Sequence, residues 1–93
     1  MDSLKETSKA MCSDNYKERF KAEYQQLKIR YEKLKKFNYT IEAAERTKHN
    51  YSCTPFPMPK HDCPEELLSQ QQSVMGEYLH ILEVRAVIEG IAL

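Results

Sequence analysis

Hydrophobic and polar residues alternate in the first half of this 93-residue chain with the period of a helix. Between residues 20 and 41 the stripe advances in alternating steps of four and three, as in an amphipathic helix or a coiled coil. Its seven positions are Phe20, Tyr24, Leu27, Tyr31, Leu34, Asn38 and Ile41. Asn15 precedes the stripe, and Glu18 follows three residues later, which is the spacing of a capping box. The pattern predicts a helix over residues 15–46.

Asn38 is the one polar member of that stripe, and two interpretations of it stay open. A polar residue buried in a coiled-coil seam fixes the register of the helices at some cost in stability. Alternatively, Asn38 lies on a partly exposed stretch near the end of the helix, where a polar side chain needs no partner.

A proline-rich segment separates this helix from a second one. Residues 47–62 contain Pro55, Pro57 and Pro59, and each proline disfavours helix in the residue before it, so we expect an extended linker. The run 62–65 then offers an aspartate cap, a proline in the first turn and an acidic residue, and it predicts a helix over residues 63–89 that Gly90 ends. Residues 1–14 lack periodicity and are expected to be a flexible N-terminus, outside a hairpin domain of residues 15–91.

The second helix is apolar over much more than one stripe of about 100°, the width that a single neighbouring helix covers. One partner helix within the chain would therefore leave apolar area exposed. We predict an all-α protein in which an antiparallel two-helix hairpin, similar to a coiled coil, assembles into a homo-oligomer.

Composition and charge narrow the class of partner. Two glycines, no tryptophan and 30% charged residues favour helices over a sheet. Residues 1–50 carry twelve Lys or Arg against eight Asp or Glu, a balance of +4, and residues 51–93 carry two against six, a balance of −4. Because the net charge is zero, nucleic acid is an unlikely partner. No stretch has the length or hydropathy of a signal peptide or a membrane span, so we expect a soluble intracellular protein that does not bind membranes.

No motif in the sequence indicates catalysis. A Gly-rich phosphate loop, a nucleophile elbow and a metalloprotease motif are all absent, so we expect no enzyme activity, no catalytic residues and no cofactor. Four residues around the linker are possible zinc ligands, namely His49, Cys53, His61 and Cys63. Structural zinc sites normally use closely spaced pairs, whereas the two cysteines are ten residues apart, so we expect no metal.

The first helix carries the more suggestive chemistry. Lysines and arginines outnumber acidic residues on it, and tyrosines recur every seven or eight residues along one side. Cations beside aromatic rings suit a phosphorylated ligand with a base, because the cations hold phosphate while a ring stacks on the base. Lys28 and Arg30 are the candidate phosphate ligands, and Tyr24 and Tyr31 are candidate stacking rings. The alternative is a solvated basic face beside tyrosines that line the hairpin seam.

The second helix carries a row of polar residues on an apolar face. Gln71, Tyr78 and Arg85 lie seven residues apart among aliphatic side chains, and such groups need partners. Arg85 either pairs with Glu89, or with a glutamate of another protomer, or clamps an anionic ligand between protomers, and these alternatives stay open. Tyr78 is a further candidate stacking ring.

The sequence also resembles a known family. The resemblance is carried by stretches that include Tyr16-Lys17-Glu18-Arg19, Arg30-Tyr31-Glu32-Lys33-Leu34, Cys63-Pro64 and Leu82-Glu83-Val84-Arg85-Ala86. Over residues 15–91 they resemble small helical proteins of tailed phages, including crAss-like phages. In size and two-helix plan the chain is similar to the phage hairpin proteins that sequester nucleotide second messengers of bacterial immunity, in the anti-CBASS and anti-Thoeris groups.

This resemblance implies a phage anti-defence protein in the cytoplasm of an infected bacterium. It would bind a cyclic ADP-ribose isomer or a cyclic oligonucleotide and hold it without cleavage. The alternative function is a structural or adapter protein whose apolar hairpin docks a host or phage protein.

Overall fold

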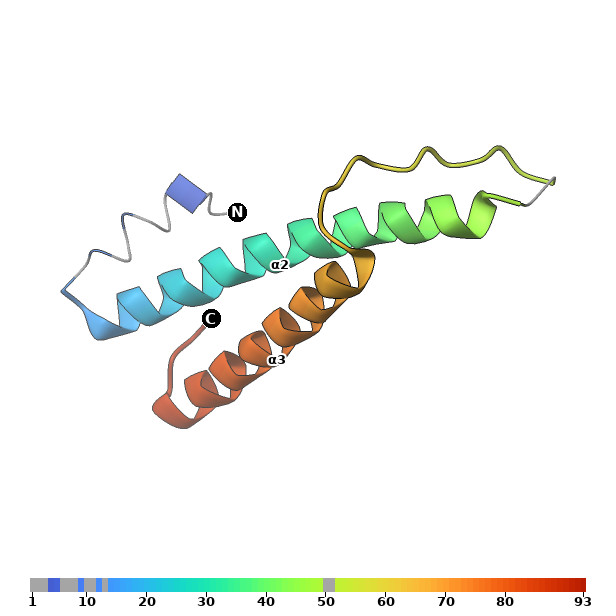
Figure 1. Ribbon diagram of the computed structural model, residues 1–93. Helices are drawn as coiled ribbons and strands as arrows, with labels where there is room; N and C mark the ends of the chain where they lie inside the picture. The colour runs from blue at the N-terminus through green and yellow to red at the C-terminus, as the bar shows by residue number, and fades with distance from the viewer. Residues whose placement is uncertain (1–3, 6–8, 10–11, 13, 50–51) are drawn as a thin grey trace.

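The computed structural model describes residues 4–5, 9, 12, 14–49 and 52–93 of the chain. Two long helices, α2 (Tyr16–Thr47) and α3 (Glu65–Glu89), pack against each other in opposite directions (Figure 1). The described residues contain no strand. The prediction of an all-α protein with two packed helices is therefore confirmed. The flexible N-terminus expected over residues 1–14 lies largely outside the described residues.

The first turn of α2 is capped by the residue that the sequence indicates. The Asn15 side-chain oxygen accepts hydrogen bonds from the backbone N–H groups of Lys17, at 2.9 Å, and Glu18, at 3.2 Å. These bonds satisfy two of the backbone donors that a helix N-terminus leaves without a partner. Asn15 therefore fixes where α2 starts.

The linker returns along the last turns of α2 before α3 begins (Figure 1). The backbone N–H of Phe56 donates to Thr47 Oγ1 at 2.8 Å, at the end of α2. Further on, the His61 ring meets the Phe37 ring edge to face, with centroids 6.1 Å apart. Because the linker runs back along the C-terminal turns of α2, α3 begins beside the middle of α2 and packs against its middle and N-terminal parts.

The start of α3 differs from the expectation. The helix begins at Glu65 rather than at residue 63, Pro64 is the N-cap residue, and no side chain caps this end. The expected cap at Asp62 with Pro64 in the first turn is therefore wrong. The reason is that a proline holds the residue before it extended, which keeps Cys63 out of the helix. At the other end Gly90 has a left-handed φ of +68°, and the Ile91 N–H donates to the Ala86 oxygen at 2.8 Å.

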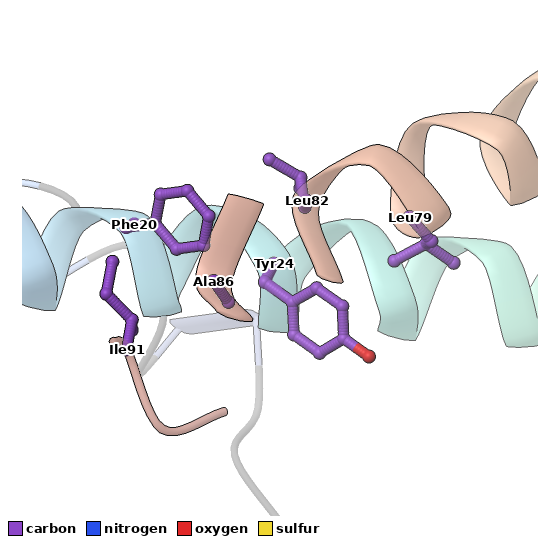
Figure 2. Packing of buried hydrophobic residues seen from close by; sticks show 6 residues of the cluster. All are labelled: Phe20, Tyr24, Leu79, Leu82, Ala86 and Ile91. Carbon is purple, nitrogen blue, oxygen red and sulfur yellow. The ribbon is translucent and has the colours of Figure 1, made fainter. Parts of the chain in front are cut away.

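The buried core lies where the N-terminal half of α2 meets the C-terminal half of α3 (Figure 2). Leu82 is the only large side chain among the described residues that is fully buried. Leu27 and Tyr31 pack against this cluster from α2. The cluster consists of Phe20, Tyr24, Leu79, Leu82, Ala86 and Ile91. Ile91 joins it because the turn at Gly90 folds the chain back over the helix end.

Asn38 continues the seam between the helices beyond the core. Its amide nitrogen donates to Gln72 Oε1 at 2.8 Å and to the Leu68 backbone oxygen at 3.3 Å. Asn38 therefore lies on the seam, as the first interpretation has it, although its side chain is only partly buried there. The two bonds give the side chain the partners that a half-buried amide requires.

A broad apolar surface of α3 faces away from α2. Val87 and Ile88 expose 82% and 78% of their area, and Leu67, Val74 and Ile81 are each about half exposed. The excess of apolar surface expected from the sequence is present in the single chain. Homo-oligomerisation itself stays a prediction.

Candidate functional site

A small cleft opens along one edge of the α2–α3 seam. It has a volume of about 240 Å³. Tyr24, Lys28 and Tyr31 follow one another on α2 at steps of four and three, so they share one side of that helix. The lining residues are Tyr24, Lys28, Tyr31 and Glu32 from α2, and Gly76, Leu79 and Glu83 from α3. Three of the six predicted site residues therefore come together here.

Tyr24 forms the floor of this cleft. Only 6% of its area is exposed, and its hydroxyl donates to Glu83 Oε2 at 2.9 Å. Burial, together with the hydrogen bond to Glu83, raises the pKa of Tyr24 above its ordinary value. The Lys28 ammonium lies 5.9 Å from the centre of the Tyr24 ring, within the range of a cation–π contact. The cleft thus places a positive charge beside an aromatic ring that belongs to the buried core.

Tyr31 reaches α3 because the residue facing it is a glycine. A Cβ placed on Gly76 would lie 3.4 Å from Tyr31 Cε1, so the ring rests against the bare backbone of α3. Lys35 lies 5.9 Å from the Tyr31 ring centre and 5.8 Å from that of Tyr39. Each tyrosine ring of this edge therefore has a lysine beside it.

A second cleft, of about 460 Å³, adjoins the first along α2. The two clefts share Lys28 and Glu32. The described residues that line the second are Gln25, Lys28, Ile29, Glu32, Lys33 and Lys36. Three lysines against one glutamate make this surface positive, and among the described residues none of the three forms an ion pair. The pair of clefts can hold an aromatic group at one end and anionic groups at the other.

Tyr78 and Arg85 lie on the opposite edge of the seam. The Tyr78 hydroxyl bonds to Glu23, five residues before Lys28, and five residues turn a helix by about 140°. Glu83, which faces the first cleft, is likewise five residues beyond Tyr78. The two hydrogen bonds therefore flank the core on different sides. The bond to Glu23 is also the main cause that raises the pKa of Tyr78.

Arg85 contacts three side chains of its own chain. Its Nη2 donates to the Tyr16 hydroxyl at 3.0 Å, and its Nε lies 3.4 Å from Glu89 Oε2. The guanidinium carbon sits 5.1 Å from the centre of the Phe20 ring. Tyr16 in turn donates to Glu89 at 2.8 Å, and this bond is the largest cause of its raised pKa. Pairing with Glu89, one of the three alternatives for Arg85, is present in the single chain.

Arg30 belongs to the same edge as Tyr78. It is exposed and lies seven residues after Glu23, which is two helical turns. The six predicted residues therefore form two groups. Tyr24, Lys28 and Tyr31 line one cleft, while Arg30, Tyr78 and Arg85 follow the other edge.

Several cleft residues were not predicted as site residues. Lys33 and Lys36 stand out in the sequence only as members of a basic helix, although their spacing of three residues makes them neighbours on its surface. Gly76 and Glu83 gave no sequence signal at all, because their roles depend on which face of α3 meets α2.

The possible zinc ligands do not converge in the described part of the chain. There, no group of three or more His, Cys, Asp or Glu side chains could hold a metal ion. His61 instead contacts the Cys63 backbone oxygen through Nδ1 at 2.9 Å and lies 3.9 Å from Glu65. Neither α2 nor α3 combines the length and the hydropathy of a membrane-spanning segment.

The fold is that of a two-helix hairpin protein with clefts along the seam between its helices. The Sequestin family model matches residues 14–88, which is most of the chain, and the protein belongs to this family. The family name fits a protein that sequesters a ligand rather than one that transforms it. No curated protein and no solved structure matches the sequence.

Proposed function

We propose that this protein binds a nucleotide second messenger of bacterial immunity and sequesters it without cleavage. The ligand class is a cyclic ADP-ribose isomer or a cyclic oligonucleotide. The observation that carries the proposal is the cleft of Tyr24, Lys28 and Tyr31, which continues into a cleft with two more lysines. Membership of the Sequestin family and the resemblance to phage hairpin proteins support it.

The two clefts divide the chemistry of such a ligand between them. A base stacks on the Tyr31 ring, the partly exposed tyrosine of the smaller cleft, since every base offers a π-face. Phosphates reach Lys28, Lys33 and Lys36, whose ammonium groups supply charge-assisted hydrogen bonds. The Tyr24 hydroxyl donates to Glu83 and, like any tyrosine hydroxyl at physiological pH, carries no charge. The positive charge of the site therefore comes from lysines alone.

The proposed setting is the cytoplasm of a bacterium infected by a phage, where the protein acts as a homo-oligomer in anti-defence. A sequestering protein competes with the host receptor of the messenger by mass action. It must therefore be abundant, bind tightly and return the ligand intact when it unfolds.

The experiment is isothermal calorimetry against a panel of immune nucleotides, followed by heat release and chromatography of the bound ligand. We expect one class of nucleotide to bind and to be recovered unchanged. A cleaved product would identify an enzyme, and the absence of binding across the panel would reject sequestration.

A matched pair of charge reversals tests the location of the site. Lys28→Glu is expected to lower affinity by about 100-fold, since it removes one charge-assisted contact and adds a repulsive charge. Lys48→Glu changes the net charge equally at the far end of α2 and should leave affinity within about twofold. Equal losses in both variants would mean that only the overall charge matters and that the cleft is not the site.

A further inference from the structure

A third cleft, of about 430 Å³, lies between α2 and the first turns of α3. Tyr39 contributes a ring to it that is 55% exposed, and Gln72 contributes a partly buried amide. The described residues that line this cleft include three carboxylates and no lysine or arginine. We call it the Tyr39 cleft. Its composition is therefore the opposite of the lysine-lined cleft on α2.

The Tyr39 cleft and the first cleft lie along the same edge of the seam. Their α3 residues follow one another at steps of four and three, so they share one side of that helix. In chain order these residues are Glu65, Ser69 and Gln72 in the Tyr39 cleft, then Gly76, Leu79 and Glu83 in the first cleft. On α2 the Lys35 ammonium lies 5.9 Å from the Tyr31 ring centre and 5.8 Å from that of Tyr39. The two clefts are therefore neighbours, with one lysine between their rings.

The Gln72 amide is held in a fixed orientation. Its Oε1 accepts a hydrogen bond from Asn38 Nδ2 at 2.8 Å, and Asn38 also donates to the Leu68 backbone oxygen at 3.3 Å. Among the described residues the Gln72 amide nitrogen has no acceptor, so its two N–H groups are available to a ligand. An amide that is already oriented loses little conformational freedom when it binds.

The carboxylates determine which part of a nucleotide this cleft can take. Glu42, Glu45 and Glu65 repel a phosphate, whereas a carboxylate readily accepts hydrogen bonds from ribose hydroxyls. Glu42 and Glu65 each pair with a cationic or titratable side chain one turn away, and Glu45 has no ion pair within the described part of the chain. A hydroxyl both donates and accepts, so a sugar can bond to Glu45 and to Gln72 at once. The cleft therefore suits a neutral sugar.

We propose that the Tyr39 cleft is a second subsite of the nucleotide site and that it binds a second ribose of the ligand. The Tyr39 ring packs against the sugar, and Glu45 and Gln72 bind its hydroxyls. Lys35 lies beside the phosphates that join this ribose to the nucleoside at Tyr31, eight residues or about 12 Å away along α2. Both proposed ligand classes contain a second ribose joined through phosphate. The inference rests on the proposed function and adds the part of the ligand beyond its phosphates.

The test uses ADP and ADP-ribose as probes, because ADP-ribose carries the second ribose and ADP does not. Isothermal calorimetry should give the wild-type protein about 10-fold higher affinity for ADP-ribose, the gain from one or two hydrogen bonds. Gln72→Ala should reduce this ratio to less than about threefold. Gln71→Ala is the matched control and should keep the wild-type ratio, because Gln71 is exposed and points about 100° away from Gln72.

Tyr39→Ala is a second variant that spares the seam, because Tyr39 has no hydrogen bond among the described residues. It should also reduce the ratio to less than about threefold, and circular dichroism checks that the helices persist in every variant. A wild-type ratio near one would overturn the subsite. A ratio that Gln72→Ala and Tyr39→Ala both leave unchanged would place the second ribose elsewhere and would also overturn it.

Lys28→Glu separates this inference from the proposed function. It should weaken ADP and ADP-ribose alike and leave their ratio unchanged, since both probes carry the phosphates. If it weakens both probes while the Tyr39 cleft variants change nothing, the subsite fails and the phosphate site stands. If it weakens neither probe while Gln72→Ala lowers the ratio, the proposed phosphate site fails and the ribose subsite stands.

Discussion

The two edges of the α2–α3 seam carry similar residues, a tyrosine, a glutamate and a cation, but the cations have different partners. On each edge a tyrosine of one helix bonds to a glutamate of the other, Tyr24 to Glu83 on the first and Tyr78 to Glu23 on the second. The cations differ. Arg85 is held by Glu89, Tyr16 and the Phe20 ring, whereas Lys28 has only the face of a tyrosine ring among the described residues.

This difference suggests different roles for the two edges, the Arg85 edge in stability and the Lys28 edge in ligand binding. A cation whose partners belong to its own chain contributes to the fold, although an exposed pair such as Arg85 with Glu89 contributes only modestly. A cation without a carboxylate partner has little to lose in the free protein and can gain a phosphate. Substitutions on the Arg85 edge should therefore change melting, and substitutions on the Lys28 edge should change affinity.

The largest effect is expected at Leu82, which both edges share. Leu82→Ala should reduce the free energy of unfolding by about 2 to 5 kcal/mol, because it leaves a cavity in place of the one large side chain that is fully buried among the described residues. Urea unfolding at fixed protein concentration measures it. Leu82→Met keeps the volume and should cost less than about 1.5 kcal/mol. A loss below that figure for Leu82→Ala would show that the seam is loosely packed and that the two edges are not coupled through it.

The next effect concerns the lysines of the larger cleft. Lys33→Glu combined with Lys36→Glu should weaken nucleotide binding by about 10-fold to 100-fold and leave the melting temperature nearly unchanged, because within the described part of the chain neither lysine has an ion pair to lose. Calorimetry at two salt concentrations measures both the affinity and its salt dependence, which should become weaker in the variant. Retained affinity would confine the ligand to the tyrosine cleft.

The spacing of apolar residues was enough to predict the helices and the positions on their seam. It could not predict which side chains of one helix contact which residues of the other. The four-three spacing predicted two packed helices, and it placed Asn38 on the seam, where it bonds to Gln72. The position of Lys28 beside Tyr24 follows from their spacing on one helix. Gly76 against Tyr31 could not be predicted, because it requires the rotation of α3 about its axis. The same rotation decides that Tyr78 and Arg85 face away from the first cleft.

Arg85→Ala sharpens the comparison from the other edge. It should lower the melting temperature of the free protein, by less than Leu82→Ala does, because Glu89, Tyr16 and Phe20 lose their partner. The shift that nucleotide adds to the melting temperature should persist. Thermal melts with and without ligand measure both quantities. An unchanged melt of the free protein combined with loss of the ligand shift would instead make Arg85 a clamp for the ligand.

Tyr24 predicts how the first edge responds to pH. Because the pKa of Tyr24 is raised in the folded protein, by burial and then by Glu83, the folded state retains the phenol proton where the unfolded chain releases it. This contribution to stability is complete below about pH 10 and is lost as the pH rises through the folded pKa. Tyr24→Phe should lower the free energy of unfolding by about 1 kcal/mol at neutral pH. It should also reduce the further fall in that free energy at alkaline pH. Tyr39→Phe, at an exposed position, is the control. If the free energy of unfolding falls equally at alkaline pH in both variants, Tyr24 is not the residue responsible.

The smallest effects should come from Gly76 within α3 and Gly90 just after its end, with opposite signs. A methyl group on Gly76 would meet Tyr31 Cε1 at 3.4 Å, an ordinary contact, while alanine favours helix over glycine. Gly76→Ala should therefore raise the free energy of unfolding by up to about 1 kcal/mol and weaken nucleotide binding slightly, as the methyl group enters the cleft. Gly90→Ala should destabilise by about 1 kcal/mol, because Gly90 has a φ of +68° that alanine adopts only with strain. Urea unfolding of both variants gives the signs directly. If Gly76→Ala also destabilises, Tyr31 has no room to yield, and the wall of the first cleft is rigid.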